Sequence, residues 1–177
     1  MTKTGIVLCL LIVFGMCTET GFAAGEPPPE VGQADGYTIR ILTYNICGLP
    51  DMLTASRDIF PAEKRFPYLG EKFGEYDIVG LQELFIPERF IIEKSLSQYY
   101  LARGADTHNM RAPGSGVYIF SKWGITASHY EKWEKGEGYD AISYKGYVAA
   151  RVSVDEEFSI DVYSLHAQAG DTPGLRK

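Results

Sequence analysis

The sequence contains few cysteines, and their scarcity excludes a disulfide-based architecture. Only three occur among the 177 residues, and Cys9 and Cys17 belong to an apolar N-terminal segment. If that segment is removed, Cys47 remains alone and no disulfide can form within the chain. We expect Cys47 to serve as a small buried apolar residue, in preference to a reactive thiol or an intermolecular partner.

The sequence also lacks an excess of positive charge. Lys and Arg number 17 against 23 Asp and Glu, so the net charge is −6. An acidic chain exerts no long-range attraction on a polyanion, so nucleic acid would need a local basic patch or a metal ion to hold it. Nucleic acid is therefore a less favoured partner. The ordinary apolar and charged fractions, 45% and 23%, are typical of one globular domain.

No apolar run is long enough to span a bilayer comfortably. The run Gly5–Met16 falls short of the roughly 20 residues that a spanning helix needs. Lys3 precedes this run, and a more polar stretch ending in small residues follows it up to Ala24. This layout is typical of a secretory signal peptide over residues 1–24. We therefore expect the protein to be secreted or periplasmic.

The rest of the N-terminal region predicts a cleavage site and a linker. Cleavage is expected after Ala23 or Ala24; a lipid anchor at Cys17 is a minor alternative, because the residues before it match a bacterial lipoprotein site poorly. Residues 25–36 combine three consecutive prolines with glycines and acids, which predicts an extended, solvated linker. The folded domain is expected over residues 37–177.

Beyond the linker, the apolar pattern predicts a mixed α/β domain. Helices are expected around Phe66–Phe73, entered at Pro61 or Pro67, and from Pro87 to about Tyr99. Runs rich in β-branched and aromatic residues predict strands at Tyr37–Ile46, Asp77–Phe85, Gly116–Lys122, Tyr147–Val154 and Phe158–His166. Strands outnumber helices in the second half, which favours a layered architecture of sheets and helices.

Three polar residues, Asn45, Glu83 and His166, stand at the ends of predicted strands. A strand end is rigid and directs its side chains into the cleft that the loops form. A carboxylate there can hold a hard cation such as Mg²⁺, and an amide can bind the metal weakly or donate to a phosphoryl oxygen. A protonated histidine can stabilise negative charge that develops on phosphorus. Together they suit phosphoryl transfer to water.

Each of these residues also has an ordinary structural interpretation. An Asn commonly forms a turn, a Glu is commonly a solvated loop acid, and a His is commonly a satisfied core or surface residue; spacing alone favours these roles. Patterns for zinc proteases, P-loops and nucleophile elbows are absent from the sequence. Residues 114–116 are interpreted as a tight turn into a strand, and His108 and His129 are expected to be exposed.

Five segments, in order, resemble the motifs of the endonuclease/exonuclease/phosphatase superfamily. ILTYNI resembles the first strand, which ends in Asn, and DIVGLQEL resembles the strand whose Glu is the central metal ligand. GSGVYIFSKWGI resembles a later strand, with Gly124 where proline is usual. GYDAISYKGYVAARV and IDVYSLHAQAG resemble the neutral sphingomyelinase branch, with Ser164 where Thr is common. The resemblance covers about Arg40 to Thr172.

The resemblance implies a four-layer αββα sandwich and a phosphodiesterase that depends on Mg²⁺ or another divalent cation. Its substrate would be a phospholipid headgroup at a membrane surface, with sphingomyelin favoured. Glu83 would be a metal ligand, Asn45 would orient the metal or the phosphoryl group, and His166 would bind the scissile phosphate. Asp140 would lie near the substrate. Gln82 and Lys145 would support these residues from behind.

The family's later "G-D-x-N" and "S-D-H" motifs do not occur before Lys177. His166 cannot contact the phosphoryl oxygens and also activate water on the opposite side of phosphorus. We therefore expect the chain to be the N-terminal part of a longer enzyme. A DNase-like nuclease and an inositol-phosphate phosphatase are alternatives within this fold. A non-catalytic binding protein is the alternative from another class, and the sequence indicates no protein partner.

Overall fold

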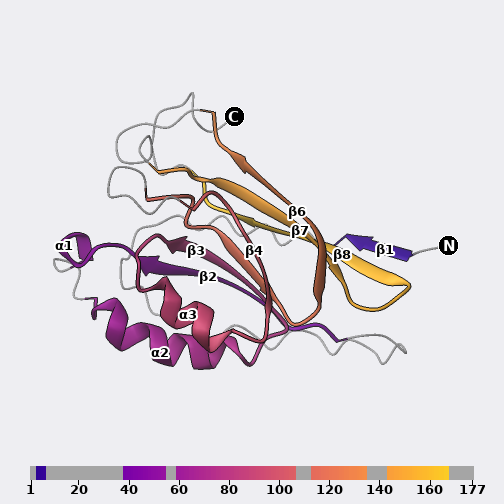
Figure 1. Cartoon of the computed structure of the whole chain (residues 1–177), viewed down its shortest axis with the longest axis horizontal. Helices are drawn as coiled ribbons and strands as arrows, with labels where there is room; N and C mark the ends of the chain where they lie inside the picture. Colours follow the sequence, from indigo (N-terminus) through magenta and orange to yellow (C-terminus); the bar gives the residue numbers. More distant parts are fainter. Residues whose placement is uncertain (1–2, 7–37, 55–58, 107–112, 135–142, 168–177) are drawn as a thin grey trace, which may run out of the picture.

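The computed structural model describes residues 3–6, 38–54, 59–106, 113–134 and 143–167. In these ranges the chain forms two four-stranded sheets (Figure 1). The helix-covered sheet has the order β2 (Ile41–Gly48), β3 (Ile78–Leu84), β5 (Tyr118–Ser121), β4 (Tyr100–Arg103). The second sheet has the order β1 (Lys3–Ile6), β8 (Phe158–Leu165), β7 (Gly146–Ser153), β6 (Gly124–Lys132).

Helices cover the outer face of the first sheet. Figure 1 shows α2 (Ala62–Phe73) and α3 (Arg89–Ser95) side by side on that face, with the short α1 (Asp51–Thr54) beyond the end of β2. The helix α2 begins after Pro61, so Pro61 rather than Pro67 marks its entry. A Cβ atom on Gly70 would lie 2.5 Å from Ser95 Oγ, so only glycine allows the two helices this close approach.

Two apolar cores hold the layers together. The core between the helices and the first sheet includes Phe66, Phe73, Leu81, Leu84 and Phe120. The core between the two sheets includes Ile78, Ile119, Val148, Ile160 and Val162. The strand β3 contributes to both cores and is buried on both faces, as a central strand should be. The mixed α/β sandwich predicted from the sequence is confirmed, and the described residues form its helix, sheet and sheet layers.

Besides β1, two further strands were not predicted, and the predicted second helix is too long. The strands β4 and β6 are mostly exposed and lie at sheet edges, so they lack the alternation that marks half-buried strands. The helix α3 ends at Ser95 because the chain turns there to begin β4 at Tyr100. The turn into β5 is confirmed, with Gly114 and Gly116 at φ 83° and 63°. His129 is exposed as expected, and His108 lies outside the described residues.

Most of the predicted signal peptide and linker lies outside the described residues, and both stay predictions. The strand β1 comes from this region and pairs in parallel with β8, with Lys3 opposite Phe158. Within the ranges that the structure describes, no helix combines the length and the apolar character needed to cross a bilayer.

Candidate functional site

Three of the predicted site residues meet at one end of the core between the sheets. The distance from His166 Nε2 to Glu83 Oε1 is 3.4 Å, and the Asn45 side chain is hydrogen-bonded to the same carboxylate. The side chains of His166 and Glu83 are 11% and 21% exposed, so the pair is reachable but largely removed from water. The fourth predicted residue, Asp140, lies outside the described residues.

Strand alternation explains the position of His166. In β8, Ile160 and Val162 face the core between the sheets, and Ser164 lies buried on the same face. Because side chains two residues apart share a face, His166 continues this row just past the strand end. The row therefore changes from apolar to polar as it approaches Glu83.

Simple alternation fails at Glu83. Leu81 and Leu84 both pack in the helix-side core, although residues three apart should face opposite ways. Between them, Glu83 has φ 58°, a left-handed conformation that costs a non-glycine residue roughly 1–2 kcal/mol. This turn of the backbone aims the carboxylate at His166 in the other sheet instead of into the helix-side core.

A bulge in β2 orients Asn45. The register runs from Asn45 opposite Gln82 directly to Gly48 opposite Leu84, so two residues of β2 face one residue of β3. Cys47, inside the bulge, has φ 49°, and its N–H donates to Asn45 Oδ1 at 3.0 Å. Since the amide oxygen is engaged in this way, the amide NH₂ is the group that donates to Glu83.

A polar layer joins the sheets directly beneath the site. Gln82 Nε2 donates to Ser164 Oγ at 3.0 Å and to Thr43 Oγ1 at 3.3 Å. A Cβ atom on Gly80 would lie 3.3 Å from Ser164 Oγ, so this glycine lets the second sheet approach closely. These contacts agree with the supporting role predicted for Gln82, and they fix the distance between β3 and β8.

The backbone of His166 is anchored on both sides. Its N–H donates to Gly146 O at 2.9 Å, and Trp133 Nε1 donates to its carbonyl oxygen at 2.7 Å. Phe85 lies beside the imidazole, with ring centroids 6.0 Å apart. No pattern in one sequence marks an indole that anchors a distant backbone carbonyl, so this contact of Trp133 becomes visible only in the structure.

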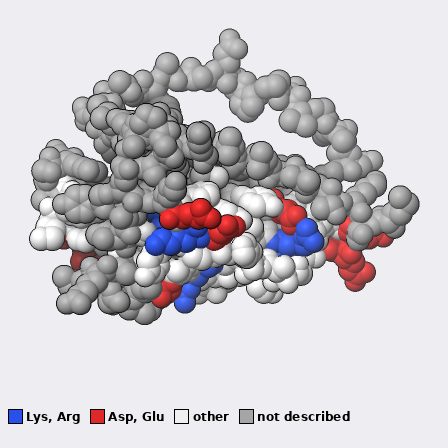
Figure 2. Space-filling model, turned by 90° about the horizontal axis from the view of Figure 1, so that it is seen from above, with Lys and Arg blue, Asp and Glu red and all other residues white. Residues whose placement is uncertain are grey.

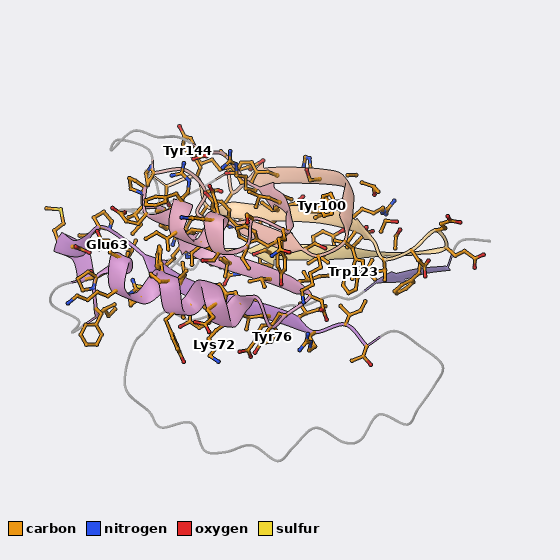
Figure 3. The ribbon with its side chains drawn as sticks, turned by 60° about the horizontal axis from the view of Figure 1, so that its bottom comes forward. Glu63, Lys72, Tyr76, Tyr100, Trp123 and Tyr144 are labelled. Atoms are coloured by element: carbon orange, nitrogen blue, oxygen red, sulfur yellow. The ribbon has the colours of Figure 1, made fainter. Side chains whose placement is uncertain are left out.

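Glu83 is held in its ionised form. Burial is the largest single influence and opposes ionisation, but hydrogen bonds from His166 and Asn45, with the charges of His166 and Lys145, hold the pKa of Glu83 below its ordinary value. Lys145 is only 7% exposed and directly precedes β7. Figure 3 shows Tyr144, the neighbour of Lys145, at the upper edge of the molecule and Trp123 lower and further to the right.

The site offers Mg²⁺ a single carboxylate from the described ranges. Within them, no group of three or more acidic, histidine or cysteine side chains is placed to hold a metal ion together. Mg²⁺ is commonly bound by one or two carboxylates with waters and substrate phosphate completing its shell, so Glu83 fits such an ion. Asn45 Oδ1 already accepts the Cys47 N–H, and its role as a metal ligand stays a prediction.

Comparison with known proteins places these features in context. No family model matches the chain. The chain is 27% identical to a sphingomyelinase of Mycobacterium tuberculosis over 164 residues, which cover 89% of this chain and 32% of that protein. It is 31% identical to a sphingomyelinase of Dictyostelium discoideum over 115 residues, 56% of this chain and 25% of that protein. The chain thus spans a third or less of the length of these relatives.

Solved structures with the same arrangement include enzymes of several kinds. Beta toxin from Staphylococcus aureus matches with TM-score 0.65 and 20% identity over 77% of this chain and 52% of the toxin, and one beta toxin structure contains bound magnesium ions. Sphingomyelinase C from Streptomyces griseocarneus matches at 0.59 and 21%, covering 77% and 51% of the two chains. TDP2 of D. rerio, complexed with a single-strand DNA product, matches at 0.57 and 15%, covering 76% and 48%. The chain therefore has the DNase I-like fold that these structures share.

Proposed function

We propose that the protein is a Mg²⁺-dependent phosphodiesterase that cleaves the headgroup of a phospholipid, with sphingomyelin as the favoured substrate. The observation that supports this most is the junction of Asn45, Glu83 and His166 at three strand ends. The likeness to sphingomyelinases in sequence and in fold adds to it. We extend the proposal to the site roles predicted for these residues and to a position of Asp140 near the substrate.

The chemistry assigned to the chain's own residues follows from their contacts. Glu83, held ionised, would bind Mg²⁺ as an oxygen ligand. Such an ion, when bound, polarises a phosphoryl oxygen and eases departure of the leaving oxygen. Asn45 holds the carboxylate in place through its NH₂ group. His166 Nε2 lies 3.4 Å from Glu83, and a protonated imidazole at this position could donate to a phosphoryl oxygen of the substrate.

Charge distribution favours a lipid over DNA as the substrate. The chain is acidic, with net charge −6. On the face seen in Figure 2, the basic side chains of the described residues lie beside acidic ones instead of forming a stripe of one sign. A stripe of basic side chains is the usual means of holding a DNA strand by its phosphates. A nuclease of this fold is nevertheless the second candidate, because TDP2 with its DNA product shares the fold.

A panel of substrates tests the proposal. The intact protein would be assayed with Mg²⁺ on vesicles of sphingomyelin, vesicles of phosphatidylcholine, single-stranded DNA and inositol phosphates. The expected result is release of phosphocholine from sphingomyelin and loss of this release on chelation. Faster cleavage of DNA or of inositol phosphates would replace the lipid assignment with the corresponding alternative. Turnover of none of these substrates would favour the non-catalytic binding protein.

We further infer that the chain is exported, because Lys3, the apolar run and the small residues up to Ala24 follow the order of a signal peptide. Cleavage there would also remove β1 from the second sheet. N-terminal sequencing of the protein recovered outside the cytoplasm tests this. A first residue near Gly25 is expected, and a product that retains Met1 would contradict export by cleavage.

A further inference from the structure

The bulge that orients Asn45 leaves two backbone carbonyls outside the sheet ladder. Ile46 and Cys47 lie between the paired positions Asn45 and Gly48, and Cys47 is in a left-handed conformation. Buried carbonyl groups need hydrogen-bond donors, and a strained residue persists only when its surroundings hold it. The bulge therefore requires a donor from elsewhere in the fold.

Arg65, in the first turns of α2, supplies this donor. Its Nη1 donates to Ile46 O at 2.8 Å, its Nη2 to Cys47 O at 3.0 Å and its Nε to Phe60 O at 2.6 Å. The guanidinium is planar and fixes the angles between its donors, so one side chain holds both bulge carbonyls and the loop before α2. A lysine ammonium has no such fork.

The contacts continue from Arg65 to the site. The Cys47 residue is held at both ends, because Arg65 binds its carbonyl and Asn45 Oδ1 accepts its N–H. Next to it, a Cβ atom on Gly48 would lie 2.6 Å from Glu83 O, so the bulge packs directly against the backbone of the strained Glu83. The orientation of Asn45 and the position of Glu83 both depend on this loop.

We propose that Arg65 is a positioning residue for the site: by clamping the β2 bulge, it sets the amide of Asn45 against Glu83 and thereby tunes the binding of a divalent cation. The inference rests on the proposed function, and it adds a residue of α2 to a site built from strand ends. Supporting partners that orient metal ligands typically change metal affinity by about 10- to 100-fold when they are removed.

The test compares Arg65→Ala, Arg65→Lys and the control Lys64→Met in the intact protein. Lys64 is the exposed neighbour of Arg65 and lines the same shallow surface pocket of about 300 Å³, so its loss removes a nearby charge without touching the bulge. Mn²⁺ affinity would be measured by electron paramagnetic resonance. The Asn45 side-chain NH₂ signals would be followed by NMR, and the midpoint of thermal unfolding would be recorded for each variant.

Both Arg65 variants should bind Mn²⁺ about 10- to 100-fold more weakly and should shift the Asn45 NH₂ signals, whereas Lys64→Met should match the parent. Because Arg65 lines the open pocket, added ethylguanidinium should partly restore Mn²⁺ affinity to Arg65→Ala, and ethylammonium should not. If Arg65→Ala does not fold, Arg65→Lys keeps the charge and the aliphatic stem and takes its place.

Two results would separate this inference from the proposed function. A folded Arg65 variant with parental Mn²⁺ affinity and parental Asn45 signals overturns the positioning role, even if the protein hydrolyses sphingomyelin. If the Arg65 variants change the Asn45 signals and weaken Mn²⁺ binding, the positioning role is supported. If the parent protein at the same time hydrolyses no phosphodiester, the proposed function is overturned.

Discussion

The strand β3 has an acidic residue at each end, and the two residues have different kinds of partner. Asp77, just before β3, accepts hydrogen bonds from the Arg40 N–H at 2.8 Å and from Lys122 Nζ at 3.1 Å. Glu83, at the other end, meets His166 Nε2 at 3.4 Å. Burial opposes ionisation of both, and hydrogen bonds together with nearby charges outweigh it and lower both pKa values.

The two carboxylates differ in how readily they could exchange a hydrogen-bond partner for a ligand. Asp77 closes the start of β3 with the Arg40 backbone N–H, the Lys122 ammonium and the Arg40 guanidinium 3.6 Å away, and Lys122 N also donates to the Asp77 carbonyl at 2.9 Å. Glu83 faces the imidazole of His166 and the neutral amide of Asn45. Its own backbone is in a strained, left-handed conformation. A carboxylate held by exchangeable partners can accept a ligand, whereas one saturated by fixed cations stabilises the fold. Strain retained at Glu83 is typical of functional sites.

The largest expected effect comes from Glu83→Gln. The substitution keeps the shape of the side chain but removes the charge that would bind the cation, so phosphocholine release from sphingomyelin should fall by about 10²- to 10³-fold or more. Steady-state assays with Mg²⁺ check this, and circular dichroism checks that the variant is folded. Parental turnover in a folded Glu83→Gln variant would show that the catalytic site lies elsewhere in the protein.

The next largest effect is expected from His166→Gln. Glutamine retains a donor near the Nε2 position but cannot carry the positive charge, so turnover should fall by about 10²-fold. The measurement is kcat with saturating Mg²⁺. A matched control is His129→Gln, because His129 is exposed on β6, and it should keep parental kcat. Equal losses in the two variants would remove the special role of His166.

Asp77→Asn should separate stability from activity. It removes the charge that pairs with Lys122, and the contact is partly exposed to solvent, so the free energy of unfolding should fall by about 1 kcal/mol with kcat unchanged. Urea unfolding at neutral pH measures the loss. The folded state lowers the pKa of Asp77, so its stabilisation is present above the unfolded pKa and disappears as pH falls through the folded pKa. The gap between variant and parent should therefore close in acid.

The smallest effect concerns the backbone at Glu83. Both Glu83→Gly and Glu83→Ala remove the carboxylate, but glycine accepts φ 58° without strain. The Gly variant should therefore be more stable than the Ala variant by about 1 kcal/mol, the reverse of the usual order in strands. Urea unfolding of the two proteins measures the difference. If the Ala variant were the more stable one, residue 83 would not adopt the left-handed conformation in solution.

Sequence reasoning identified the polar residues that the structure brings together, but it did not identify the backbone irregularities that orient two of them. Asn45, Glu83 and His166 were predicted because they stand at the ends of apolar strands, and the order of these strands predicted the sandwich. The left-handed turn at Glu83 and the bulge before Gly48 carry no signal in one sequence. Arg65 resembles any polar residue of a surface helix until its three acceptors are brought to it by the fold.

The most direct test of the account is phosphocholine release from sphingomyelin vesicles by the intact protein, followed as Mg²⁺ is added, removed by a chelator and restored. The account predicts release that depends on Mg²⁺, stops on chelation, returns with the ion and is absent in Glu83→Gln. The account would be contradicted if phosphocholine release persisted after chelation or if Glu83→Gln retained it. Either result would show that no cation-dependent phosphodiester site lies at the ends of β2, β3 and β8.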